Sequence, residues 1–162
     1  MSLGNVTLLD QGAFGAIGTR KFTVASGTTA SINAGEPVAK ALGGATVSAM
    51  STNKPVVGTD FLAGISQSTS TETASAAGSV QVYPIVPGVV YLCAPLTAAS
   101  WDTQAEYDAL VGDRVLFDLT SGVYTITATD GANNGLVVEP LDIAKYPGKV
   151  AFSIRSAVAY YA

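Results

Sequence analysis

The chain has 162 residues, a formal net charge of −4, and 12% charged beside 48% hydrophobic residues. This length is enough for one domain, and the eight lysine and arginine residues form no basic stripe that could bind a phosphate backbone, so we expect no nucleic-acid partner. The chain has no histidine and a single cysteine, Cys93, which excludes Ser–His–Asp and Cys–His catalytic pairs, a His/Cys zinc site and an intramolecular disulfide.

Residues 1–21 place glycines between small apolar residues and keep neither a helical nor a strand period. The glycine spacing does not match a dinucleotide-binding fingerprint, and no Gly-Lys-Ser/Thr follows it. The segment has neither the basic start nor the continuous apolar stretch of a Sec signal. We interpret it as an extended docking arm whose apolar side chains are buried by a partner. The arm residues expected to bind that partner are Leu3, Val6, Leu8, Leu9, Phe14 and Ile17.

Residues 22–162 are expected to form a single, mainly β domain. Short runs rich in β-branched and aromatic residues, separated by Gly, Pro and Asn, predict its first strands. These runs are 22–25, 30–32, 45–48 and 60–65. Within 34–39, the residues Gly35 to Val38 predict a turn that re-enters a strand, because Pro37 is allowed only near a strand start or edge. The polar, low-complexity run at 66–77, SQSTSTETASAA, predicts a solvent-facing loop or the tip of a long ribbon.

The stretch from Ser79 to Leu96, SVQVYPIVPGVVYLCAPL, is expected to organise the core. Its β-branched and aromatic residues fit a half-buried pleated surface. Pro84 and Pro87 cannot donate to a ladder and therefore mark an edge, a bulge or a corner, and Gly88 completes a turn dipeptide. We predict a bent strand pair that crosses the core.

One short helix is predicted at about 103–111. Thr103 and Glu106 have the spacing of a capping box, and Gly112 can follow the last turn. Asp102, Glu106 and Asp108 could act as paired carboxylates in acid–base chemistry. No strongly apolar surround and no second catalytic residue type accompanies them, which favours a solvated helix face.

Residues 113–129 have the pattern of a β-hairpin, with a turn at 118–122. The run that begins at Asp130 fails as a calcium loop, because Ala132 stands at its third position and Leu141 at its twelfth, where a bidentate glutamate is needed. Asn134-Gly135 instead predicts a tight hairpin turn. The last strand is predicted at 150–155.

Short motifs recur between the two halves of the chain. The residues around Gly35 resemble those around Gly112, and the residues around Gly78 resemble those around Gly148. This repetition suggests a fold built from two related sheets. We therefore expect a small β-barrel or sandwich of antiparallel strands, with one short helix and an extended N-terminal arm.

A series of motifs follows the glycine-rich arm in order: AGEPV at 34–38, LAGI at 62–65, VxVxxxVxGVVYL at 80–92, GDRVLFD at 112–118 and KVAFSIR at 149–155. This order resembles the structural cement proteins, or head decoration proteins, of tailed bacteriophages. The loop at 66–77 does not match the pattern. The resemblance covers most of residues 30–156.

The resemblance implies a structural virion protein that binds the outer surface of a phage capsid, assembled in the host cytoplasm. Its partner would be the major capsid protein of the same particle, whose neighbouring subunits it cements. A homo-oligomer is implied as well, with a trimer near a threefold axis favoured and a dimer as the alternative. No run reaches the ~18 apolar residues of a membrane helix, so no membrane partner is expected.

An alternative is a glycan- or receptor-binding β module of a virion fibre or adhesin. Its stacking platform would come from Tyr91, Trp101, Tyr107, Tyr160 and Tyr161, although core packing is the commoner use of aromatic residues. A carboxylate enzyme would need two acids that converge in a pocket. The twelve acids are scattered over turns and the helix, so we expect no enzyme, no cofactor and no bound metal.

Overall fold

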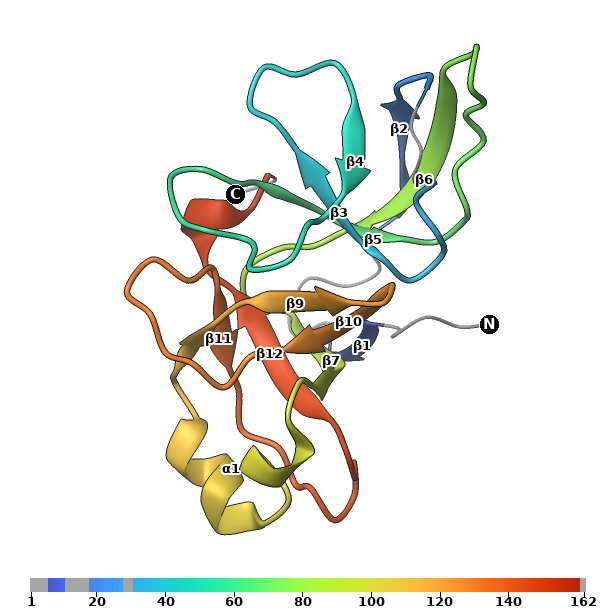
Figure 1. Ribbon diagram of the computed structural model, residues 1–162. Helices are drawn as coiled ribbons and strands as arrows, with labels where there is room; N and C mark the ends of the chain where they lie inside the picture. Colours follow the sequence, from blue (N-terminus) through green and yellow to red (C-terminus); the bar gives the residue numbers. More distant parts are fainter. Residues whose placement is uncertain (1–5, 11–17, 28–30, 161–162) are drawn as a thin grey trace.

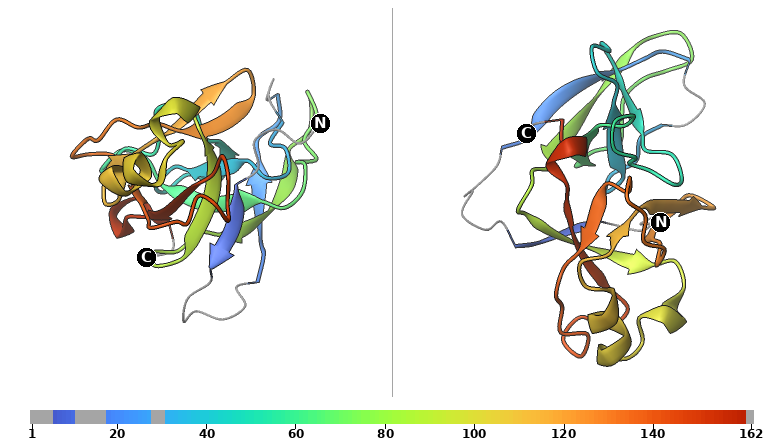
Figure 2. Two further views of the ribbon diagram at one scale, coloured as in Figure 1. Left: turned by 90° about the horizontal axis from the view of Figure 1, so that it is seen from below. Right: turned by 90° about the vertical axis from the view of Figure 1, so that its left-hand side faces the viewer.

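The computed structural model describes residues 6–10, 18–27 and 31–160. Strands hold 37% of the residues and helices 9%, which confirms the prediction of a mainly β fold with barrel-like sheets and one helix. Two β lobes are stacked one above the other in Figure 1, a barrel from the first half of the chain and a sheet from the second half. The lobes remain stacked in the turned view at the right of Figure 2.

Five described strands close the barrel in the order β2-β4-β3-β5-β6. Their bounds are Arg20–Val24 for β2, Pro37–Lys40 for β3, Val47–Ala49 for β4, Leu62–Ser66 for β5 and Gly78–Pro84 for β6. Side chains alternate along β6, so that Val80 and Val82 are buried while Gln81 is exposed. Ile32 also fills the barrel, but from a loop, because the described residues of the predicted 30–32 strand are not in a strand.

Seven described strands form the second lobe, in the order β8-β11-β12-β7-β10-β9 with β1 also paired to β7. Their bounds are Thr7–Asp10 for β1, Val90–Pro95 for β7, Arg114–Val115 for β8, Phe117–Thr120 for β9, Val123–Ile126 for β10, Leu136–Val138 for β11 and Val150–Ile154 for β12. The pairing is antiparallel except that β10 runs parallel to β7, as β2 does to β4 in the barrel.

The organising stretch connects the two lobes rather than forming a strand pair. β6 pairs with β2 and β5 in the barrel, whereas β7 pairs with β12, β10 and β1 in the sheet. The two strands do not pair with each other, so the prediction of a strand pair is wrong. The turn between them is present, with Gly88 at a φ of 84°, and Ile85 and Val89 on either side of it are buried.

The helix α1 spans Gln104–Leu110, as the capping box predicted. The Thr103 side chain accepts a hydrogen bond from the backbone N–H of Glu106, and the Glu106 carboxylate accepts one from the backbone N–H of Thr103 at 3.2 Å. Gly112 follows with a φ of 91°, which favours glycine. Short 3₁₀ turns, η2 at Ala98–Ser100 and η3 at Ser156–Val158, flank the sheet.

The predicted hairpin exists as β9 and β10, but its turn is tighter than expected. Only Ser121 and Gly122 separate the strands, and their φ values of 52° and 79° suit a type I′ turn. The predicted hairpin turn at Asn134-Gly135 is wrong. Asn134 instead closes a turn by donating its backbone N–H to the Gly131 carbonyl at 2.9 Å.

The two lobes share one apolar cluster and a set of backbone hydrogen bonds. Met50, Leu62 and Ile65 of the barrel half belong to the same cluster as the interior of the sheet. The loop that follows β4 also bonds to the sheet, because Phe117 donates its N–H to the Lys54 carbonyl at 2.7 Å. At the other end of the chain, Tyr160 donates its N–H to the Leu62 carbonyl at 3.2 Å.

The polar run at 66–77 forms a loop beside β6. Gln67 donates its N–H to the Gln81 carbonyl at 2.7 Å, and Thr71 donates to the Ser79 carbonyl at 3.1 Å. Ser70 is buried, where its hydroxyl accepts the N–H of Ile32 at 2.9 Å. Residues 73–77 are exposed, as expected for a solvent-facing tip.

Candidate functional site

The described part of the N-terminal segment lies on the protein's own sheet. β1 pairs antiparallel with β7, with Thr7 opposite Leu92 and Leu8 opposite Tyr91 (Figure 2). Among the described strands only β7 pairs with β1. The described part of the segment is therefore bound to the chain's own sheet through the edge that faces β7.

The structure places only some of the residues that were predicted to bind a partner through the arm. Val6 is 6% exposed and belongs to the apolar cluster of the sheet, so its side chain is buried by this chain and not by a partner. Leu8 and Leu9 are placed only as backbone positions of β1. Leu3, Phe14 and Ile17 lie outside the described residues, and the predicted range 1–21 overlaps β2, which begins at Arg20.

The acidic residues around α1 serve the helix itself. A hydrogen bond to Glu106 raises the pKa of Asp102, whereas hydrogen bonds from Thr103 and Asp102 lower the pKa of Glu106. Asp108 accepts from the Gln104 amide at 2.7 Å, and the same amide donates to the Leu141 carbonyl at 2.9 Å. All three carboxylates are on exposed residues. They cap and brace the helix, in line with the predicted solvated face.

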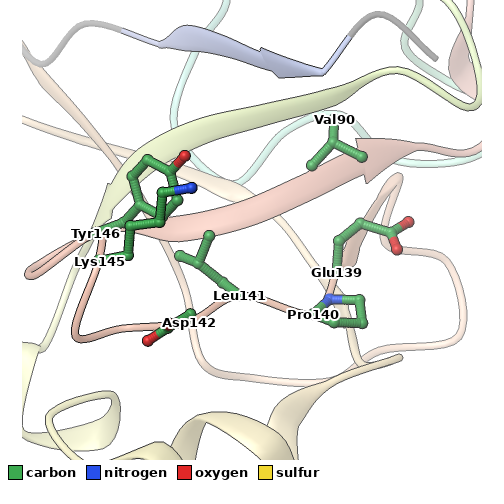
Figure 3. A pocket seen from close by; sticks show the side chains of 7 residues that line it. All are labelled: Val90, Glu139, Pro140, Leu141, Asp142, Lys145 and Tyr146. Carbon is green, nitrogen blue, oxygen red and sulfur yellow. The ribbon is translucent and has the colours of Figure 1, made fainter.

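An open depression of about 560 Å³ lies between Val90 and the loop that follows β11. Glu139 and Asp142 line it, but Figure 3 shows their carboxylates directed away from each other. Glu139 accepts a hydrogen bond from the Ser153 hydroxyl, and Lys145 lies 5.3 Å from the centre of the Tyr146 ring. The depression does not bring two acids together as a glycosidase-type site requires.

A second open depression, of about 540 Å³, shares the Pro140–Asp142 segment with the first. Gln104 and Asp108 line its helix side. Both polar side chains already bond to each other, and the Gln104 side-chain oxygen accepts the N–H of Ile143 at 3.1 Å. This depression therefore marks the contact between the helix and the loop, and its polar side chains are already used in that contact.

Within the described residues, no three His, Cys, Asp or Glu side chains are close enough together to hold a metal ion. Asp130, at the start of the rejected calcium loop, accepts the backbone N–H of Arg114 at 2.8 Å and pairs with its guanidinium at 3.3 Å. These contacts lower the pKa of Asp130. Burial raises the pKa of the Cys93 thiol to about 12, so the thiol stays protonated and unreactive.

The described helices include none that is both long enough and apolar enough to cross a membrane.

The described residues of the stacking platform in the alternative hypothesis do not form one surface. Tyr91, Trp101 and Tyr107 are buried in the core of the sheet lobe. Tyr160 packs edge-on against Phe22 with ring centres 6.2 Å apart. Tyr161 lies outside the described residues. The four described residues therefore offer a glycan no shared aromatic surface.

The exposed loops at the end of the barrel remote from α1 contain no charged residue. Three loops, 25–27, 41–45 and 73–77, lie at this end (Figure 1) and are almost entirely exposed; we call them the barrel tip. Gly27 donates its N–H to the Thr73 carbonyl at 3.1 Å, which joins two of the loops. The opposite end of the molecule carries the exposed acids of α1. The exposed loops at one end of the molecule are thus uncharged, and the helix at the other end is acidic.

Leu42 is the most prominent residue of the barrel tip, at 76% exposure. Its turn is held by Lys40, which is only 7% exposed and whose ammonium donates to the backbone carbonyls of Ala41, at 3.4 Å, and Gly44. The same ammonium lies 5.4 Å from the centre of the Tyr160 ring. These contacts hold the backbone of the turn that carries Leu42.

Sequence reasoning missed the barrel tip, because its three loops are far apart along the chain. The local signal was an apolar residue between Ala41 and the Gly43-Gly44 break. Comparisons with known protein families, curated proteins and solved structures gave no match for this chain.

Proposed function

We propose that the protein is a structural protein of a tailed-phage virion that binds the outer surface of the capsid and cements neighbouring major capsid subunits. The observation that carries the proposal is the barrel tip, whose exposed loops contain no charged residue and whose Leu42 is 76% exposed. Charged residues are depleted at the centre of protein interfaces, and a turn whose backbone is already held needs less ordering when a partner binds it. The tip is therefore the face assigned to the shell, and the acidic end is the face assigned to solvent.

The rest of the molecule suits a structural role. A ligand that binds only the assembled state stabilises that state in proportion to its occupancy and affinity. Repeated copies on a symmetric shell add multivalent binding without new contacts in each copy. A homo-oligomer, with a trimer favoured over a dimer, would match local capsid symmetry. The sedimentation mass of the free protein distinguishes a monomer from these two states.

The test is co-sedimentation with shells assembled from the major capsid protein of the same genome. The full-length protein should sediment with the shells at saturable stoichiometry and should raise the temperature at which the shells melt. If the protein stays in the supernatant when it is in excess over the shells, the proposal is contradicted.

A matched pair of variants tests the assigned face. Leu42→Ser should weaken the affinity for shells by about tenfold or more, since burial of a leucine side chain is worth roughly 1.5–3 kcal/mol before ordering costs. The loss is read as lower occupancy at protein concentrations that do not saturate the shells. Val123→Ser is the control, because Val123 is also exposed but lies on β10 in the other lobe. Equal loss in both variants would show that the barrel tip is not the contact face.

A further inference from the structure

The Asn134 side chain is enclosed by the turn that begins at Gly131. Its amide nitrogen donates to the Arg114 carbonyl at 2.8 Å and to the Thr129 carbonyl at 3.1 Å. A side chain at position 131 would lie within 3 Å of the Asn134 amide group, so the turn closes tightly over it. The two backbone carbonyls need a hydrogen-bond donor at position 134. An asparagine amide supplies one, whereas the carboxylate of an aspartate would be repelled by both oxygens.

Gly135 is fixed by a different constraint. A Cβ atom at this position would lie 2.7 Å from the Pro55 carbonyl oxygen and 2.9 Å from a methyl group of Val158. The Gly135 N–H donates to that same Pro55 carbonyl at 2.9 Å. Packing between the lobes therefore demands glycine directly after Asn134.

These two requirements create an Asn-Gly dipeptide, the pair in which a backbone nitrogen most readily attacks the preceding side-chain amide, because glycine offers no steric hindrance. The attack forms a bond between the Gly135 nitrogen and Cγ of Asn134. The Cγ–Nδ2 bond breaks, and ammonia leaves with the proton that the backbone nitrogen gives up. Water then opens the resulting succinimide ring to aspartate or isoaspartate.

We infer that Asn134-Gly135 is a latent deamidation site that the closed junction between the lobes keeps unreacted. The nitrogen that would attack is held by the Pro55 carbonyl, and the amide that would leave is held by Arg114 and Thr129. Both groups must be released before they can meet. Release requires the 131–135 turn to move away from the loop at 55–57, that is, local opening of the junction.

Aspartate or isoaspartate at position 134 would prevent the junction from returning to its original closed arrangement. A carboxylate at position 134 would face the carbonyl oxygens of Arg114 and Thr129 with no proton to donate. Isoaspartate would also lengthen the backbone where Val57 donates its N–H to the Asn133 carbonyl at 2.8 Å, and where Arg155 donates to the Asn134 carbonyl at 2.9 Å. Each opening event that leads to reaction would thus be irreversible.

The experiment measures deamidation at position 134 of the full-length protein by peptide mass spectrometry, in mildly alkaline buffer with and without urea. We expect the folded protein to react more than about tenfold slower than the unfolded chain, as for a site that reacts only from a rarely populated open state. Equal rates in the two samples would overturn the inference.

Two pairs of variants sharpen this test. Tyr124→Phe removes the hydrogen bond that the Tyr124 hydroxyl donates to the Met50 carbonyl across the junction, and it leaves the 131–135 turn unchanged. This variant should raise the folded-state rate of deamidation, whereas Tyr146→Phe, on the loop near the helix, should not. Asn134→Asp should lower the melting temperature more than Asn133→Asp, whose side chain is exposed. An Asn134→Asp protein that melts like the parent, or a Tyr124→Phe protein that is less stable yet deamidates at the parent rate, would each contradict the inference.

Discussion

The Tyr124 hydroxyl on β10 donates a hydrogen bond to the backbone carbonyl of Met50, the residue that follows β4 of the barrel. Both residues are buried in the apolar cluster that the two lobes share. Burial raises the pKa of Tyr124, so the phenol remains a donor across the physiological range. This side-chain contact thus adds to the backbone hydrogen bonds that join the two lobes.

Tyr124→Phe should lower the free energy of unfolding by about 1–3 kcal/mol, because the Met50 carbonyl is left buried without its donor. Denaturant unfolding of the two proteins measures the difference. Tyr146→Phe is the matched control, since the Tyr146 side chain is partly exposed beside Lys145. If both variants lose the same stability, the Tyr124 hydroxyl has no special role at the junction.

Gly64 in β5 is a position where the barrel admits no side chain. A Cβ atom there would lie 2.0 Å from the Tyr83 carbonyl oxygen and 2.6 Å from a methyl group of Val82 on the adjacent strand β6. Gly64→Ala should therefore destabilise the protein by about 2 kcal/mol or more. Gly18→Ala should have little effect, because no atom lies within 4 Å of the added methyl group. Thermal melting of both variants decides the matter, and a Gly64→Ala protein as stable as the parent would refute the close approach of β5 and β6.

Asp118 predicts a specific pH dependence. Its carboxylate accepts hydrogen bonds from the hydroxyls of Thr120, at 2.6 Å, and Thr52, at 2.8 Å, and these bonds lower its pKa. An unfolded aspartate titrates near pH ~3.9. Since the folded-state pKa is lower, this contribution to stability is present above about pH 4 and is lost as the pH falls through the folded-state pKa.

Asp118→Asn should accordingly melt below the parent at neutral pH, and the gap between the two melting temperatures should narrow as the pH falls below about 4. A series of melts across the acid range measures this gap. A gap that stays constant over the series would mean that the carboxylate charge at position 118 does not matter.

Local signals predicted the elements whose causes are local. The capping box at Thr103 and Glu106 located α1, and the restriction on Pro37 placed it at the first residue of β3. The pairing of strands depended on distant contacts. Nothing within residues 79–96 indicates that β6 closes a barrel with β2 while β7 joins β12, because those partners lie elsewhere in the chain.

The wrong turn at Asn134-Gly135 has the same origin. The dipeptide has the local chemistry of a hairpin turn. Its conformation is set instead by the carbonyls of Arg114, Thr129 and Pro55, which come from three other segments. The barrel tip likewise arises only after folding brings three separate loops to one end of the barrel.

The N-terminal segment supports a prediction that separates its structural part from a binding part. Deletion of residues 1–10 removes β1 and the buried Val6, so it should lower the melting temperature, since burial of such a side chain is worth roughly 1.5–3 kcal/mol. Deletion of residues 1–5 leaves both in place and should change the melt little. Thermal melting of the two truncated proteins beside the parent measures this contrast. If the longer deletion melts like the parent, β1 contributes nothing to the stability of the sheet.

The deletion of residues 1–5 also tests whether Leu3 and its neighbours bind the capsid shell. As a docking element, residues 1–5 should be needed for attachment although they are not needed for folding, so the shorter deletion should bind shells less tightly than the parent while melting at the same temperature. Leu42→Ser in the full-length chain gives the comparison, because it removes an apolar anchor at the barrel tip, away from β1. A loss of occupancy in both the 1–5 deletion and Leu42→Ser would indicate two separate contacts with the shell. Unchanged occupancy in the shorter deletion, together with a loss in Leu42→Ser, would remove the N-terminal residues from the interface and leave the barrel tip as the anchor.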